Sequence, residues 1–96
     1  MPDPTPIGPD TRVARREEPV AVEVDRTVVM MSLEQGMYFG LEGPGPRIWE
    51  LLATPSTPRE LRDALSAEYE VDADDCLRDV CAFLEELRSA ELIRLA

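Results

Sequence analysis

The stretch VVMMSLEQGMYFGLEGPGPRIWELL, residues 28–52, decides the fold. Its two short apolar runs, Val28–Leu33 and Met37–Leu41, are rich in sheet-forming residues and are joined at a turn, which predicts a hairpin. An apolar helical segment that contains Ile48 and Trp49 follows at once. A small sheet has edges, and an unpaired edge offers free N–H and C=O groups to an extended peptide.

The residues before this stretch predict one more strand. Val20, Val22 and Val24 alternate with smaller or charged residues, the period-two pattern of a half-buried strand. Thr27–Leu33 is apolar on both faces, so we expect it to be the central strand of a three-stranded meander. Met37–Leu41 would then lie at an edge.

Three helices are expected after the sheet. The first begins within Glu42–Pro46 and runs to about Ala53, because prolines are tolerated in a first helical turn. The second begins at Thr57-Pro58-Arg59-Glu60, a capping box. The third has Asp72 as its N-cap and runs to about Ser89 or Ala90. A short strand over Leu92–Leu95 closes the chain, and the whole predicts an α+β, winged-helix-like domain.

The apolar pattern of the third helix is wider than one core stripe. One stripe consists of Leu77, Val80, Cys81, Leu84 and Leu87, and a second, rotated stripe consists of Cys76, Val80, Phe83, Leu87 and Ala90. We expect the second stripe to line a groove beside the sheet. The predicted peptide-binding residues are Met37, Tyr38, Phe39, Gly40 and Leu41 on the strand, and Cys76, Asp79, Val80, Phe83 and Leu87 on the helix. The sequence leaves open which face of the strand meets the core.

The N-terminal residues 1–19 are predicted to be a disordered tail, so that the folded domain spans 20–96. Prolines occupy positions 2, 4, 6, 9 and 19, and the segment has little apolar surface to offset its ordering entropy. It has no basic region followed by an apolar stretch, and no run approaches the roughly 18 apolar residues that span a membrane. A cytoplasmic location is expected.

The composition argues against catalysis. Histidine is absent, which removes the commonest general base and metal ligand, so we expect no cofactor and no metal. Cys76 and Cys81 would point about 140° apart on a helix and are not expected to form a disulfide. The net charge of −10 repels phosphate backbones and acidic membranes.

Several segments together resemble the PqqD-like family. They are Tyr38–Leu52 with its Ile48-Trp49 pair, Leu61–Leu65, Tyr69–Asp72 and Val80–Leu87. The resemblance covers about residues 20–95. It implies a recognition element for ribosomally made, modified peptides (a RiPP recognition element), in which the leader segment of a precursor peptide adds as an antiparallel strand to Met37–Leu41, beside the third helix. The Gly43–Pro46 segment departs from the family, whose members often carry Asn or Asp where Glu42 stands.

The strand and first helix are most similar to stand-alone lasso-peptide proteins, whose partner is a leader peptidase. The resemblance leaves open a peptide chaperone for a radical SAM enzyme, as in pyrroloquinoline quinone biosynthesis. A winged-helix DNA-binding regulator is disfavoured, because residues 72–90 hold six acidic residues against Arg78 and Arg88. An adaptor for another folded protein is a further alternative. Asp79 and Glu86 suggest a leader with a basic residue.

Overall fold

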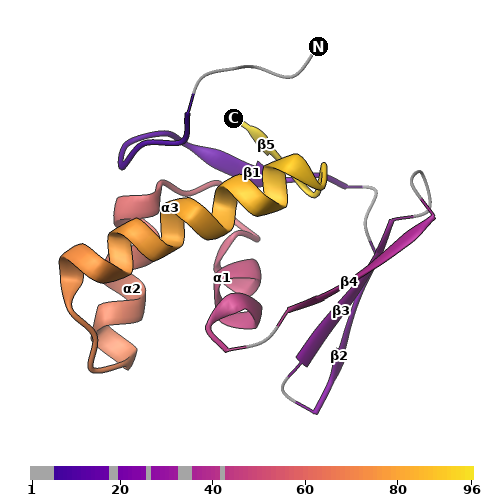
Figure 1. The fold of residues 1–96 in the computed structure, drawn as a ribbon, viewed down its shortest axis with the longest axis horizontal. Coiled ribbons are helices and arrows are strands. Elements are labelled where there is room, and N and C mark those ends of the chain that lie inside the picture. Colours follow the sequence, from indigo (N-terminus) through magenta and orange to yellow (C-terminus); the bar gives the residue numbers. More distant parts are fainter. Residues whose placement is uncertain (1–5, 18–19, 26, 33–35, 42) are drawn as a thin grey trace.

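The computed structural model describes residues 6–17, 20–25, 27–32, 36–41 and 43–96 (Figure 1). The elements follow in the order β1 (Val13–Arg15), β2 (Val20–Val24), β3 (Thr27–Ser32), β4 (Met37–Leu41), α1 (Gly45–Leu51), α2 (Pro58–Glu68), α3 (Ala73–Ser89) and β5 (Ile93–Leu95). The predicted α+β fold, a three-stranded sheet followed by three helices, is confirmed.

The three-stranded sheet has the order β2-β3-β4, and both neighbouring pairs are antiparallel. The prediction that β3 is central is therefore confirmed. In the register, Val29 lies opposite Val22 on one side and Gly40 on the other. Gly36, which precedes β4, has a φ of +66°, a conformation that glycine adopts without steric cost. Residues 33–35 of this connection lie outside the described residues.

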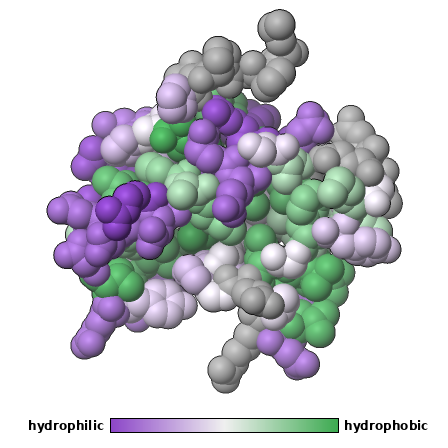
Figure 2. Space-filling view, viewed as in Figure 1, coloured by the Kyte–Doolittle hydropathy of each residue, from purple (hydrophilic) through white to green (hydrophobic). Residues whose placement is uncertain are grey.

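Strand β2 forms where it was expected, but the prediction that one of its faces is buried is wrong. All five of its residues are exposed, and its valines Val20, Val22 and Val24 keep 46–54% of their surface. The physical reason is its place in the fold: the sheet extends to one side of the helices, and α1 contacts β3. Figure 2 shows the resulting hydrophobic surface over this part of the sheet.

The core lies between the sheet and the three helices. Met30 of β3, Leu61 of α2 and Leu84 of α3 are almost fully buried. Helix α3 begins after Asp72, whose carboxylate accepts hydrogen bonds from the backbone N–H groups of Asp74 and Asp75, as its sequence predicts. The buried side chains of α2 and α3 pack against each other and hold the two helices together.

The prediction of a disordered N-terminal tail is wrong for the segment that holds β1. Val13 is fully buried and Ile7 is 6% exposed. Strand β1 pairs antiparallel with β5, and Val13 exchanges two backbone hydrogen bonds with Ser56 at 2.8 and 3.0 Å. Residues 6–17 are ordered because their few apolar side chains meet partners that lie far along the chain. Residues 1–5 and 18–19 lie outside the described part.

The capping box at the start of α2 is confirmed, and it supports a stability prediction. The Glu60 N–H donates to Thr57 Oγ1 at 3.2 Å, and the Thr57 N–H donates to Glu60 Oε1 at 2.9 Å. Replacing Thr57 with Ala should lower the free energy of unfolding by about 1 kcal/mol, because one N–H of the first turn loses its acceptor. Urea denaturation measures the change. The variant Thr57→Ser keeps the hydroxyl and serves as control, so equal stability of the two variants would contradict the role of the cap.

Candidate functional site

Strand β4 is an edge of the three-stranded sheet, with β3 on one side and no strand on the other among the residues that the structure describes. Its outer face carries Tyr38, 72% exposed, and Gly40. Its inner face carries Phe39, which is half-buried, and Leu41, which is 5% exposed. This settles the question that the sequence left open: Phe39 and Leu41 face the core. Met37 shares their face but is half exposed.

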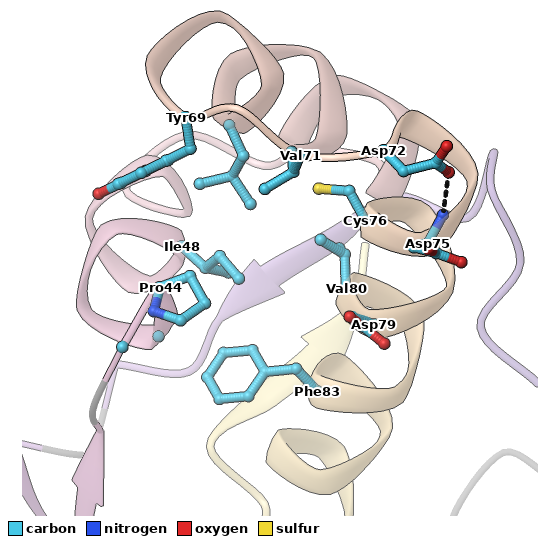
Figure 3. Close-up of a pocket in the computed structure, with 13 residues that line it drawn as sticks. Pro44, Ile48, Tyr69, Val71, Asp72, Asp75, Cys76, Asp79, Val80 and Phe83 are labelled. Carbon is cyan, nitrogen blue, oxygen red and sulfur yellow. Dashed lines mark hydrogen bonds between the residues drawn. The ribbon is translucent and has the colours of Figure 1, made fainter.

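An open pocket of about 700 Å³ lies between α3, the start of α1 and the end of α2 (Figure 3). Four of the five helix residues that the sequence assigned to a groove line it together: Cys76, Asp79, Val80 and Phe83. The side chains of Val80 and Phe83 point from α3 toward Ile48 and Pro44, which belong to the opposite wall. The second apolar stripe of α3 therefore does border a hollow.

The remaining lining residues were not identified from the sequence. They are Gly43, Pro44, Gly45, Ile48, Leu65, Tyr69, Val71, Asp72 and Asp75. The sequence signal that could have found them is the pair of large apolar residues Tyr69 and Val71 in the short segment between two helices, and in the structure they remain 49% and 47% exposed.

The pocket and the end of β4 meet at Gly45. A Cβ atom on Gly45 would lie 3.2 Å from Cζ of Phe83 and 3.3 Å from Cβ of Leu41. A side chain at this position would push against both the strand and α3. The Gly-Pro-Gly-Pro segment, which departs from the family pattern, thus gives a close approach between the sheet edge and the pocket.

Leu87 takes a different place from the one that the sequence suggested. Its side chain is 4% exposed and packs in the core, and it does not line the pocket. The residues of β4 do not line the pocket either; they lie beside it along the sheet edge. The candidate site therefore has two adjoining parts, the β4 edge and the α1–α3 pocket.

Among the described residues, the charged side chains that line the pocket are all aspartates. The carboxylate of Asp72 caps α3, and that of Asp75 lies 2.7 Å from Nη2 of Arg78. Asp79 is exposed and has no hydrogen-bond or ion-pair partner among the described residues. The rim of the pocket is thus negative, while its floor is apolar.

The two cysteines are free thiols, as predicted. Burial raises the pKa of Cys76, and the negative charge of Asp79 raises it further. Burial raises the pKa of Cys81 as well, and the negative charge of Glu85 adds a smaller increase. Both thiols therefore stay protonated at neutral pH, and a protonated thiol is a poor nucleophile.

Two other kinds of site are absent from the described residues. No group of three or more carboxylate or thiol side chains there is placed to hold a metal ion. None of the helices in the described ranges is long and apolar enough to cross a membrane.

The family of the chain follows from comparison with known proteins. The family model described as coenzyme PQQ synthesis protein D (PqqD) matches residues 27–93, from the start of β3 into β5. The chain belongs to the PqqD family. The resemblance stated from the sequence is therefore confirmed. A comparison with curated proteins finds no match.

Two solved structures share the fold of this PqqD-family chain. One, described as TbiB1 in complex with the TbiA(beta) leader peptide, has 40% sequence identity and a TM-score of 0.79, and the match covers 84% of this chain and 94% of that chain. The other, described as lasso peptide synthetase B1 complexed with the leader peptide, has 24% identity and a TM-score of 0.76, over 85% and 96% of the two chains. The second likeness concerns the fold alone.

Proposed function

We propose that this PqqD-family protein is a non-catalytic recognition element that binds the leader segment of a ribosomally made precursor peptide. The observation that carries the proposal is the 40% identity, over 84% of the chain, to a structure described as a leader-peptide complex. The geometry of this chain supports it, because an unpaired strand edge adjoins an apolar pocket.

Binding would begin with main-chain pairing along β4. The leader adds as a strand to Met37–Leu41, and each N–H···O=C bond contributes roughly 0.5–1.5 kcal/mol net. Such bonds carry little sequence information, because every residue offers the same backbone groups. They supply affinity and fix the direction of the peptide.

Specificity would come from side chains. Leader residues that face the helices pass Phe39 and Phe83, and those near the end of β4 reach the pocket beside Gly45. Apolar leader side chains are favoured there because they remove exposed apolar surface from water. Tyr38 and Gly40, on the outer face, would flank the leader on the side away from the helices.

The bound leader would then be delivered to an enzyme of the same pathway, and a leader peptidase of a lasso-peptide pathway is the partner that we propose. The described residues offer no histidine and no activated thiol for chemistry of their own. A separate processing enzyme would cut or modify the precursor while this protein holds its leader. Nucleic acid is not proposed as a partner, because the chain carries a net charge of −10.

The test is a fluorescence-anisotropy titration of the labelled TbiA(beta) leader peptide with the full chain. We expect saturable binding near micromolar, about −8 kcal/mol, and none to a labelled DNA duplex of the same concentration. A scrambled peptide of the same composition controls for non-specific binding. Equal binding of the scrambled and native peptides, or salt-sensitive binding to DNA alone, would contradict the proposal.

A further inference from the structure

The α1–α3 pocket carries a charge pattern that strand addition does not use. Its apolar lining includes the buried side chains of Ile48 and Val80 and the half-exposed Val71, and its charged lining residues among the described residues are Asp72, Asp75 and Asp79. Among the described residues no arginine lines it, although the chain has ten basic residues. A purely apolar peptide segment would pack on the apolar lining but would offer no positive charge to the aspartate carboxylates.

The three carboxylates are not equally available to a guest. Asp72 is occupied as the N-cap of α3, and Asp75 pairs with Arg78 on the outer side of the helix. Asp79 stands one turn further along α3, next to Val80, and is exposed with no partner among the described residues. It lies near enough to the thiol of Cys76 for its charge to raise the pKa of that group. Asp79 is therefore a free carboxylate at the border of an apolar surface.

We propose that this pocket selects a leader segment in which a bulky apolar side chain is accompanied, on the same face of the peptide, by a lysine or arginine whose cationic head meets Asp79. This inference rests on the proposed function, since it names the guest of the same site. In an extended peptide, residues i and i+2 point to the same face and lie roughly 7 Å apart. One of them fills the apolar floor, and the methylene stem of the other passes over Val71 or Val80 before its charge reaches the rim.

The negative charge has a second effect, which is exclusion. An acidic leader residue at this position would meet the carboxylate of Asp79, and like charges that lie close together repel. A neutral leader residue would neither be attracted nor be repelled by the carboxylate of Asp79. The site should therefore rank basic above neutral and neutral above acidic guests, and the ranking should weaken with salt.

The experiment is a selection from a phage-displayed library of random linear peptides on the immobilised full chain. It is run in parallel on Asp79→Asn and on Asp74→Asn. Each variant loses one carboxylate from α3, so the two have the same net charge. They differ only in the position of the loss, because Asp74 does not line the pocket. A general attraction of basic peptides to an acidic protein is therefore equal in both. Circular dichroism verifies that each variant is folded.

We expect peptides selected on the wild type and on Asp74→Asn to pair a lysine or arginine with a bulky apolar residue two positions away, and this pairing to disappear on Asp79→Asn. In a synthetic peptide from the selection, replacing the basic residue with norleucine should weaken binding about tenfold, as expected for a lost hydrogen bond to a charged group. The same replacement should change binding to Asp79→Asn by less than about twofold.

Other results would overturn the inference. If basic residues are equally frequent in the peptides selected on the wild type, Asp79→Asn and Asp74→Asn, they reflect the overall charge of the protein and not the pocket. Selected peptides that compete with the TbiA(beta) leader but show no basic preference would overturn the charge selection and leave the proposed function standing. If neither selected peptides nor the TbiA(beta) leader bind the wild type, the proposed function fails as well.

Discussion

Deleting residues 1–17 should remove about 3–6 kcal/mol from the free energy of unfolding, although these residues lie outside the sheet and helices that define the family. Ile7 and Val13 are both almost fully buried, and each buried aliphatic side chain of this size contributes roughly 1.5–3 kcal/mol. The deletion also takes the partner strand from β5 and exposes Ile93. Since small domains have about 5–15 kcal/mol in total, the loss is a large part of the stability.

Thermal and urea denaturation of the truncated and full chains measure this loss. Deleting only residues 1–5 is the matched control, because it leaves every described contact of the segment in place. The single substitution Val13→Asp, which buries a carboxylate without a hydrogen-bond donor or a counter-charge, should reproduce most of the effect of the truncation. If the truncated protein unfolds at the same temperature and urea concentration as the full-length chain, β1 contributes nothing to the stability.

The parts of the fold that the sequence predicts well are those that local patterns specify. The capping box at Thr57, the N-cap at Asp72 and the central position of Thr27–Ser32 all follow from residues within a few positions of one another. The second apolar stripe of α3 is also local, and its residues Cys76, Val80 and Phe83 line a pocket, although that pocket lies between the helices and not beside the sheet. In these cases one element contains the whole signal.

The parts that were missed depend on partners far along the chain. The short run Val13–Arg15 has too few apolar residues to predict a strand, and it becomes one because β5 and Ser56 pair with it. Burial of β2 was expected from its alternation, yet alternation cannot tell whether a helix covers the apolar face. Leu87 fits both stripes of α3, and only the packing decides that it lies in the core.

The match to the family model covers some elements of the fold and leaves others out. The matched region, residues 27–93, begins at β3 and so leaves β1 and β2 outside. The segment from β3 to α3 contains the sheet edge, the glycine-rich turn and the pocket, which are the features that the proposed function needs. Strand β1 pairs with β5, and none of its residues lines the pocket.

Replacing Phe83 with Ala should weaken binding of the TbiA(beta) leader at least about tenfold, or 1.4 kcal/mol. Phe83 is half-buried, packs on the core and lies where the pocket meets Gly45 and the end of β4. Its ring is therefore the surface that a leader side chain would contact in passing from the strand edge into the pocket. Anisotropy titration of the variant measures the loss directly.

The neighbouring residue provides the control, because Phe83 and Leu84 face different parts of the molecule. Leu84 is fully buried in the core, so Leu84→Ala should cost about 2–5 kcal/mol of stability. At a temperature where both variants are folded, it should leave leader affinity within about twofold of the wild type. Phe83→Ala should cost less stability than Leu84→Ala and more affinity. Because the two measurements are expected to rank the variants in opposite order, general destabilisation cannot imitate the result, and equal affinity of both variants would place the leader elsewhere.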